Sequence, residues 1–401
     1  MNNILILDGN QRSALAATRS IGQKGITVYV GETTTNSLAG SSKYCTQRVI
    51  VPNAETSPME YVKALLSIIS RFRVNILLPM TDISTATILA ARDSFSNVLI
   101  PYPSINTYRE VSNKSLLFKK AEALGFPVPK TIYINSPSQL TDSLASLSYP
   151  VVIKPSLSRI PGENQWVSTH VSVAQSESEL LTIINRHRWL QDHSFMLQEF
   201  IHGEGSGVFT LYKKGKPVVF FSHRRIREKP PRGGVSVLSE SIEVDPRMRK
   251  ISEGLLDSVG WHGVAMIEFK VTPDGTPYLM EINGRFWGSL QLSIDSGVDF
   301  PYLTYLMAIE EALELTTQYT TGIKSRWLLG DLDRLYLVLK DKSGDYSTKS
   351  KLNNILEFLK LFSKGTHYEV NRMSDIKPFL FELKQYIKAI HHRDTEDTEG
   401  F

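Results

Sequence analysis

The stretch GVAMIEFKVTPDGTPYLMEINGR, residues 263–285, consists of two apolar runs joined by a Pro-Asp-Gly turn, and each run contains one glutamate. Asp-Gly favours a two-residue hairpin turn, because both central positions of a type I′ turn have positive φ. With Asp274 and Gly275 as the turn, Glu268 and Glu281 are equally far from it. The stretch therefore predicts a β-hairpin in which these two carboxylates lie directly opposite each other.

One face of this hairpin is predicted to be polar. Side chains alternate along a strand, so Asn283 shares the face of Glu281, and the pairing adds Glu268. Opposed carboxylates repel by about 0.2–1 kcal/mol when exposed, which favours a cation between them, and Mg²⁺ prefers such oxygen ligands. The alternative is a solvated face on which both glutamates meet water. The opposite face is predicted to be core and carries Ala265, Ile267, Phe269, Met280 and Ile282.

Length and composition indicate a chain of two or three domains. The 401 residues carry a net charge of +4, which is too small to indicate nucleic-acid binding. The single cysteine, Cys45, excludes an internal disulfide and a multi-cysteine metal site. The start, MNNILILDGN, is expected to be a first strand and not a signal peptide, and no apolar stretch reaches the ~20 residues that span a bilayer. We expect a soluble cytoplasmic protein without nucleic-acid or membrane partners.

The first hundred residues alternate apolar runs with amphipathic segments, which favours a parallel sheet covered on both faces. A helix is predicted from Ser57 to about Phe72, with Pro58 at its first position. The turn after the first strand, DGNQRSA, contains only Gly9, so NAD binding is not predicted. The predicted strands cover 3–7, 26–30, 75–79 and 97–101, and the predicted buried face of the helix carries Met59, Val62, Leu65, Leu66 and Ile69.

A second unit is predicted to begin near Ser112 with a helix closed by Gly125. The chain then becomes mainly β up to residue 283, with a further hairpin at 213–216, and helical again after about residue 320. The predicted elements of this part are strands at 149–155 and 195–201, a capped helix from 176 to about 188, and helices at 352–362 and 376–390.

This order of parts, with the Glu-Ile-Asn-x-Arg end of the hairpin, resembles the ATP-grasp superfamily, which includes biotin carboxylase, carbamoyl phosphate synthase and the D-alanine ligases. The most specific match is MEINGRFWGSLQLSIDSGVDF, 280–300, which resembles the carboxylase and carbamoyl phosphate synthase versions. The resemblance implies an α/β and α+β fold. It comprises an N-terminal Rossmann-like pre-ATP-grasp domain (1–108), a two-lobed ATP-grasp domain (109–320) with a lid at about 130–201, and a mainly helical C-terminal extension (321–401).

The resemblance also implies roles for the hairpin residues and for two lysines. Glu268, Glu281 and Asn283 match the Mg²⁺ ligands, with Mn²⁺ as an alternative ion. Arg285 would face the γ-phosphate and the carboxylate being phosphorylated, or, in the alternative, be a rim arginine paired to an acid. Lys154 and Lys114 match residues that contact the nucleotide phosphates, although without the resemblance a solvated residue on a first helical turn would be the favoured interpretation of Lys114.

Further residues would bind the nucleotide. Backbone groups of Glu199, Phe200 and Ile201 would contact the adenine edge, and Glu204 the ribose, although a glycine-rich turn there needs no ligand. Ser156 and Ser158 are expected to donate to phosphate. The loop 155–168, however, contains only Gly162, where relatives have several glycines, so its closure over the phosphates is in question.

The segment 222–237 is strongly basic and is predicted to bind a carboxylate or phosphate-bearing substrate through His223, Arg225 and Arg227. The alternative is a solvated edge strand made basic against aggregation.

The resemblance implies an ATP-dependent ligase that forms an acyl phosphate and couples it to an amine, with Arg285 and Lys154 as the catalytic residues and small-molecule substrates as partners. A bicarbonate-activating enzyme and a nucleotide-binding scaffold without turnover are the alternatives. The helical segment after residue 321 is compatible with a homo-oligomer interface, a membrane-surface helix or a cap over the acceptor site. We favour the cap, because an acyl phosphate must be shielded from water.

Overall fold

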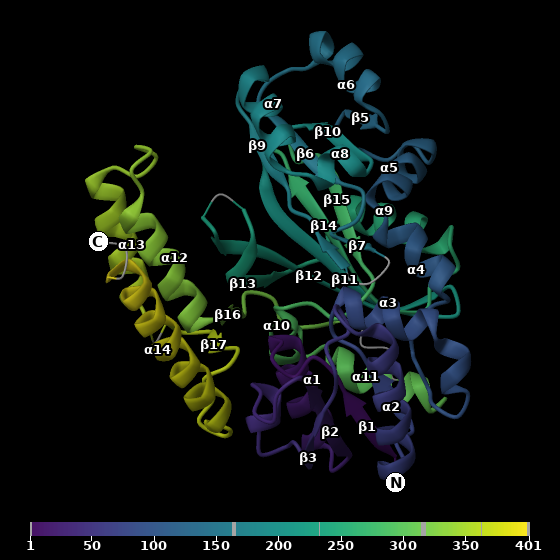
Figure 1. Cartoon of the computed structure of the whole chain (residues 1–401). Helices are drawn as coiled ribbons and strands as arrows, with labels where there is room; N and C mark the ends of the chain where they lie inside the picture. Colours follow the sequence, from purple (N-terminus) through teal and green to yellow (C-terminus); the bar gives the residue numbers. More distant parts are fainter. Residues whose placement is uncertain (1, 163–165, 232, 314–317, 362, 399–401) are drawn as a thin grey trace.

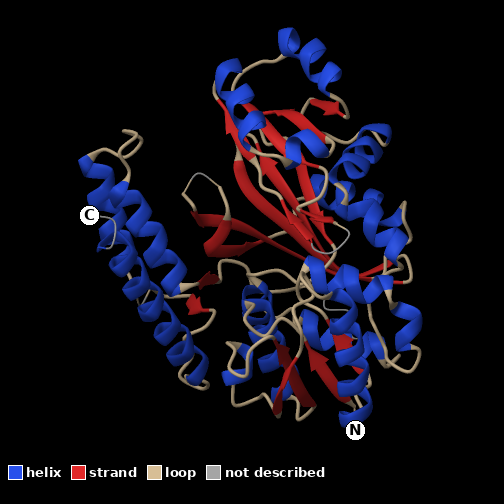
Figure 2. Cartoon of the chain, viewed as in Figure 1, coloured by secondary structure: helices blue, strands red, loops and turns tan. Residues whose placement is uncertain are grey.

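The structure is a computed structural model and describes residues 2–162, 166–231, 233–313, 318–361 and 363–398. Within these ranges it is a mixed α/β structure with several sheets (Figures 1 and 2). A parallel sheet lies near the N-terminus, a small antiparallel sheet lies at the opposite end of the view, and a long central sheet lies between them. No helix in the described ranges is both long enough and apolar enough to cross a membrane.

The N-terminal sheet has the strand order β3-β2-β1-β4, and all its pairs are parallel. Three of the four predicted strands are present, whereas the segment 97–101 forms only a single bridge, from Leu99 to Ile76. The sequence did not predict β3, because its QRVI pattern lacks an apolar run. The strands are β1 Asn3–Ile6, β2 Thr27–Glu32, β3 Gln47–Ile50 and β4 Ile76–Leu78.

Helices α1 Arg12–Gln23, α2 Pro58–Phe72 and α3 Asp82–Ala90 follow strands of this sheet. The predicted bounds of α2 are confirmed, but its buried face is corrected. Tyr61 and Leu65, four residues apart, are buried, whereas Met59 is 76% exposed. The reason is position, because Met59 lies in the first turn of α2 and lines a cavity instead of the sheet.

The small antiparallel sheet has the order β5-β10-β6-β9 and a separate hydrophobic core that includes Leu180 and Leu197. The capped helix is confirmed, since Ser176 Oγ accepts a hydrogen bond from the Glu179 N–H at 3.3 Å, and it ends at Arg186. The strands of this sheet and the helices beside them are β5 Thr131–Ile134, α6 Pro137–Ser143, β6 Val151–Pro155, β9 Ser172–Ala174, α7 Glu177–Arg186, α8 Trp189–Asp192 and β10 Phe195–Glu199. A separate hairpin, β7 Arg159–Pro161 and β8 Trp166–Ser168, follows β6.

The central sheet has the order β15-β14-β11-β12-β13-β16-β17. The predicted hairpin at 213–216 is confirmed as a two-residue turn, with φ of 51° at Lys214 and 79° at Gly215. The strands are β11 Glu204–Lys213, β12 Lys216–Lys229, β13 Val235–Ile242, β14 Gly263–Val271, β15 Pro277–Asn283, β16 Lys324–Arg326 and β17 Thr366–Tyr368.

The β14–β15 hairpin pairs Glu268 directly with Glu281, as predicted, but its turn differs from the prediction. Thr272 N–H donates to Thr276 O, and only Gly275 in the turn has positive φ, so the turn has three residues. A bulge at Met280 offsets the extra residue and restores the register at the glutamates. Consequently Leu279 is fully buried, while Met280, predicted to be core, is only half-buried.

The C-terminal segment contributes α12 Leu328–Lys340, α13 Thr348–Leu359 and α14 Lys377–Thr398, and β16 and β17 extend the central sheet. Helices make up most of its described residues, and its two strands join it to the central sheet. It is also anchored to α1. The buried Arg19 donates to the Asp375 carboxylate at 2.9 Å and to the Glu369 and Val370 carbonyl oxygens at 2.8 Å.

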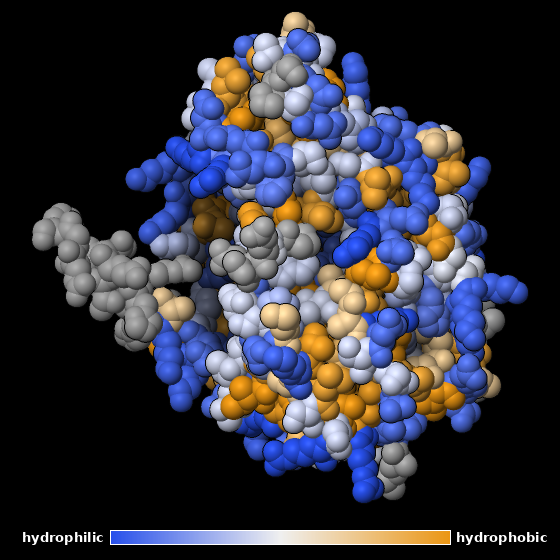
Figure 3. Space-filling view, turned by 45° about the vertical axis from the view of Figure 1, so that its right-hand side comes forward, coloured by the Kyte–Doolittle hydropathy of each residue, from blue (hydrophilic) through white to orange (hydrophobic). Residues whose placement is uncertain are grey.

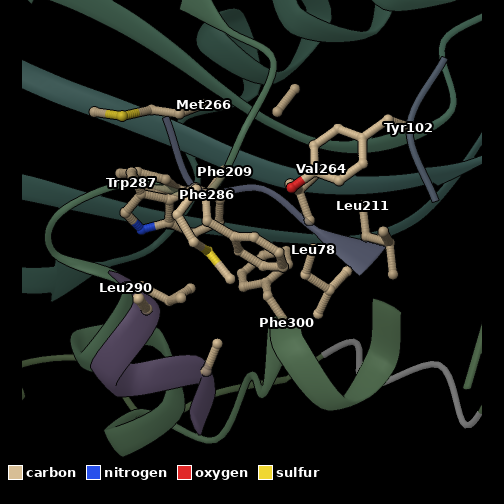
Figure 4. Packing of buried hydrophobic residues seen from close by; sticks show 14 of the residues in the cluster. Leu78, Tyr102, Phe209, Leu211, Val264, Met266, Phe286, Trp287, Leu290 and Phe300 are labelled. Carbon is tan, nitrogen blue, oxygen red and sulfur yellow. The ribbon is translucent and has the colours of Figure 1, made fainter. Parts of the chain in front are cut away.

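Aromatic side chains link the central sheet to the loop after β15 (Figure 4). The Trp287 ring lies 4.4 Å from the Phe209 ring and 5.0 Å from the Phe300 ring, between centroids. Because Phe286 and Trp287 are buried, the loop that begins with Arg285 is fixed beside the sheet. The remaining helices are α4 Ile105–Ser112, α5 Lys114–Ala123, α9 Pro246–Asp257, α10 Leu290–Asp295 and α11 Phe300–Ala308.

Candidate active site

A cleft of about 600 Å³ separates the small sheet from the central sheet. The chain segment Glu199–Ile201, which connects β10 to β11, lines the cleft, as do Lys154 of β6 and Arg285 after β15. The central sheet contributes Met266, Glu268, Lys270, Met280, Glu281 and Asn283. Most residues predicted to act on ATP therefore lie around one cleft.

The two opposed glutamates form a polar centre in this cleft. The Asn283 Nδ2 lies 3.3 Å from Glu268 Oε1 and 3.1 Å from Glu281 Oε1. Arg225 Nη2 lies 2.5 Å from Glu268, and Lys114 Nζ lies 3.2 Å from Glu281. Because the glutamate side chains are only 19% and 28% exposed, this is not the freely solvated face of the alternative prediction.

Electrostatics distinguish the two carboxylates. Burial raises the pKa of Glu281, but Lys114 and Lys154 outweigh burial and lower this pKa to about 2. Burial also raises the pKa of Glu268, Arg225 opposes the shift, and the charge of Glu281 adds to it. Positive charge beside the pair thus keeps Glu281 ionised, and further positive charge would favour ionisation of Glu268.

The donor set fits a hard divalent cation. Asn283 now presents its amide nitrogen to the carboxylates, while its Oδ1 accepts from Arg285 Nη2 at 3.2 Å. If the Asn283 amide were rotated so that its oxygen and nitrogen exchanged places, Asn283 Oδ1 would lie on the same side as the carboxylate oxygens of Glu268 and Glu281. Three protein oxygens would then face an ion. Hydrogen bonding decides which orientation an amide adopts. In the described part of the chain, no three His, Cys, Asp or Glu side chains cluster so as to hold a metal. An ion here would therefore need the amide oxygen and non-protein oxygens, as Mg²⁺ commonly does.

Both predicted phosphate-binding lysines are buried next to this centre. Lys154 is 7% exposed, and its Nζ donates to the Met280 carbonyl oxygen at 2.9 Å. Burial lowers the pKa of Lys154 to about 8. Lys114 is 5% exposed and donates to Ser158 Oγ at 2.8 Å, so it is not the solvated helix residue of the alternative prediction.

Ser156 and Glu204 lie away from the cleft. Ser156 Oγ lies 2.7 Å from Ser115 Oγ, so it joins β6 to α5. Glu204 is exposed at the start of β11 and does not line the cleft. Lys270 does line it and donates to the Ile201 carbonyl oxygen at 3.1 Å, with its Nζ 4.9 Å from the Phe200 ring centroid. The sequence contained a signal for Lys270, which lies two residues after Glu268 on the same strand.

The basic segment contributes only Arg225 of its three predicted substrate-binding residues. His223 is fully buried and bonds through Nε2 to Ser289 Oγ at 2.9 Å, and burial lowers its pKa to about 3. Arg227 donates to Asp331 of α12 at 2.5 Å. The prediction of a binding surface is therefore corrected for His223 and Arg227, because one is an uncharged core residue and the other joins β12 to α12. Arg232 lies outside the described residues.

Arg285 both lines the cleft and pairs with an acid. Its Nε donates to Asp82 Oδ2 at 3.0 Å, and its Nη1 donates to the Phe286 carbonyl oxygen at 3.0 Å. Burial alone would lower its pKa, but Asp82 raises it, so the guanidinium stays charged. The pairing with an acid is thus observed, while the contact of Arg285 with the γ-phosphate stays a prediction.

Sequence reasoning missed two residues that begin helices next to the N-terminal sheet. Arg12 lines the cleft, stacks 4.1 Å from the Trp327 ring centroid and pairs with the buried Glu369. Asp82, the partner of Arg285, begins α3. Both follow the carboxyl ends of parallel strands, where α/β sheets place ligand-binding residues, and this rule could have found them.

Residues 191–330 match the family described as "ATP-grasp in the biosynthetic pathway with Ter operon". Over 298 residues, the chain is 24% identical to the carbamoyl phosphate synthase large chain of Thermotoga neapolitana. This match covers 68% of the chain but 26% of that protein, so the chain spans about a quarter of its relative's length.

Solved structures share the fold at low identity. The L-amino acid ligase from Bacillus licheniformis has a TM-score of 0.61 and 19% identity, over 78% of this chain and 75% of that one. The biotin carboxylase domain of Hydrogenobacter thermophilus 2-oxoglutarate carboxylase, in complex with MgADP, ADP and bicarbonate, has a TM-score of 0.63 and 14% identity, over 80% and 73%. At these identities the likeness shows a common fold.

Proposed function

Because the chain belongs to the ATP-grasp superfamily, we propose that it is an ATP-dependent ligase that activates a carboxylate as an acyl phosphate and couples it to an amine. One observation carries the proposal. The opposed Glu268 and Glu281, bridged by Asn283, lie in the same cleft as Lys154 and Arg285. A scaffold that only bound a nucleotide would not need this combination.

The proposed enzyme has three parts. Residues 1–108 form the pre-ATP-grasp domain, 109–320 the ATP-grasp domain with a lid at about 130–201, and 321–401 the C-terminal extension. The nucleotide lies between lid and central sheet, with its base at Glu199–Ile201, where Lys270 fixes the Ile201 carbonyl group. A contact of Glu204 with the ribose is no longer proposed, because Glu204 does not line the cleft.

In the first step, an oxygen of the substrate carboxylate attacks the γ-phosphorus of ATP. An O–P bond forms, the bond to the β,γ-bridging oxygen breaks, and ADP leaves with the electron pair. Lys154 and Lys114 bind phosphate oxygens, and Arg285 orients the carboxylate and offsets developing charge. Glu268, Glu281 and Asn283 would hold Mg²⁺, which when bound neutralises phosphate charge. The magnesium salt bound by one relative favours this ion, and nothing favours Mn²⁺.

In the second step, the amine nitrogen attacks the acyl carbon, and the C–O bond to phosphate breaks. One ammonium proton goes to water and another goes to the departing phosphate. These residues act by positioning and charge, so no protein nucleophile takes part. A bicarbonate-activating reaction is the second candidate, favoured by the position of Arg285 two residues after Asn283 and by the fold shared with a biotin carboxylase domain.

The test is a screen of the full chain with MgATP, pairs of small carboxylates and amines, and bicarbonate, in which ADP, phosphate and products are measured. Amide formation with stoichiometric ADP supports the ligase, whereas ADP release that requires bicarbonate supports the second candidate. Tight ATP binding without ADP release in any combination would overturn both and favour a scaffold.

A further inference from the structure

A second cavity, of about 650 Å³, lies between the N-terminal helices α2, α3 and α4 and the segment that follows β6. Its walls are mainly apolar. The apolar lining residues include Met59, Val62, Leu66, Ala86, Ala90 and Trp166. Figure 3 brings this side of the molecule forward and shows apolar surface gathered among hydrophilic side chains.

The cavity ends at the proposed catalytic centre. Asn283 lines both the cleft and this cavity, and the cavity wall also contains Lys114, which contacts Glu281. Asp82 lines the cavity and bonds to Arg285, which lines the cleft. A ligand in the cavity would therefore reach the place where the acyl phosphate forms.

The charged groups around the cavity indicate a ligand that carries one positive and one negative charge. Asp82 is the one acid among the described lining residues, and although it accepts from Arg285 at 3.0 Å and from the Tyr108 hydroxyl at 3.1 Å, its side chain is 36% exposed and can accept further hydrogen bonds. Lys63 pairs with Glu60, Arg159 with Glu55 and Lys114 with Glu281. The exposed Arg109 is different, because it makes no ion pair within the described part of the chain.

We propose that this cavity binds the amine substrate, and that this amine carries an apolar group and an anionic group, as an apolar α-amino acid does. Its ammonium group bonds to Asp82, its apolar group packs against Ala86, Ala90 and Met59, and its carboxylate pairs with Arg109. This occupant also accounts for the 76% exposure of Met59, because the ligand covers it. The inference rests on the proposed ligase function, since it assigns the second substrate.

Calorimetry on the full chain with a non-hydrolysable ATP analogue and Mg²⁺ tests binding without turnover. The probes are L-phenylalanine, glycine, phenethylamine and 3-phenylpropanoate. We expect L-phenylalanine to bind at least about tenfold more tightly than each of the others, because only it offers all three groups. Equal affinity of glycine and L-phenylalanine, or no binding of L-phenylalanine, would overturn the assignment.

Two alanines offer a matched pair of variants. Ala90 and Ala123 are both exposed and each ends a helix, but only Ala90 lines the cavity. Ala90→Trp should weaken L-phenylalanine binding at least about tenfold and leave nucleotide binding unchanged, whereas Ala123→Trp should change neither. Loss of binding in both variants, or in neither, contradicts the proposal.

Arg109→Gln should remove the preference for L-phenylalanine over phenethylamine, and a retained preference would exclude Arg109 as the carboxylate partner. The binding assays also separate this inference from the ligase function. Binding of L-phenylalanine that Ala90→Trp abolishes, combined with no ADP release from any pair of substrates, would leave the cavity assigned and the ligase reaction wrong. Amide formation with the same amine preference in the wild type and in Ala90→Trp would support the ligase reaction and overturn the assignment of the cavity.

Discussion

At the residue scale, position along a strand decides which members of a charged run reach the cleft, because residues 223, 225 and 227 are two apart and would share one face by alternation alone. The five basic residues of 223–229 reach different partners, because β12 runs from the core past the cleft to α12. Arg225 meets Glu268, His223 is buried and Arg227 pairs with Asp331. Composition predicted a basic surface, but only the neighbouring elements determine which side chains are already paired.

Glu281→Gln tests the proposed metal site. Gln keeps the size of the side chain but lacks the negative charge that would bind a metal ion and that pairs with Lys114. We therefore expect ADP formation to fall by more than about a hundredfold with the fold intact. Glu60→Gln, at an exposed surface ion pair, is the control and should keep full activity. ADP release and thermal unfolding are the measurements, and near-normal turnover of Glu281→Gln would remove the metal assignment.

Lys154→Ala tests the proposed phosphate contact. The Lys154 ammonium lies beside Glu281 in the proposed phosphate site, so its loss should weaken ATP binding while adenosine affinity barely changes. Competition binding with ATP, ADP and adenosine measures the difference. An equal loss for ATP and adenosine would identify Lys154 as a structural lysine instead.

Glu369 gives a prediction about pH. Burial raises its pKa from 4.5 to about 6 although Arg12 opposes the shift, so the folded state binds the proton more tightly than the unfolded state. As pH rises from well below 4.5 to well above 6, the free energy of unfolding of the wild type should fall by about 2 kcal/mol relative to Glu369→Gln. Urea unfolding of both proteins across this range measures it. A constant or rising difference would contradict the raised pKa.

At the element scale, the hairpin 263–285 shows how a correct pairing followed from an incorrect turn. The sequence placed Glu268 opposite Glu281 by assuming a two-residue turn, whereas the structure has a three-residue turn and a bulge at Met280. The two differences cancel at the glutamates but not at Met280, which was predicted to be core and is only half-buried, while its neighbour Leu279 is fully buried. Periodicity therefore predicts which residues can share a face, and turns and bulges decide which of them do.

The same limit applies to the N-terminal helices. The pattern of α2 predicted its bounds, because Pro58 and the apolar spacing are local signals. It could not predict that Met59 faces a cavity, since this depends on α3, α4 and the segment after β6. The sequence could have placed Arg12 and Asp82 at the carboxyl ends of the parallel strands, but it could not show which part of the chain this edge faces.

At the scale of the whole molecule, the C-terminal segment is attached by buried charges. Arg19 of α1 is 3% exposed, and every acceptor that it has in the described chain lies in residues 369–375. Asp375 also accepts from Ser42 Oγ and the Lys43 N–H, so the contact joins three parts of the chain. The cap that we favoured from the sequence stays a prediction, but removing the segment would disturb much more than a cap.

Deletion of residues 345–401 is accordingly expected to destabilise the remaining chain, because it removes every acceptor that Arg19 has in the described chain and uncovers the part of α1 that residues 369–375 contact. If the segment were only a cap, ATP binding would survive the deletion and only ligation would be lost. Urea unfolding of the full and truncated chains measures the cost. Arg19→Met in the truncated chain should recover part of the lost stability, since it removes the unpaired charge, whereas Arg19→Met in the full chain should destabilise it by leaving Asp375 unpaired. If the truncated chain unfolds at the same urea concentration as the full chain, the segment is an independent appendage, and activity in the truncated chain then tests the cap directly.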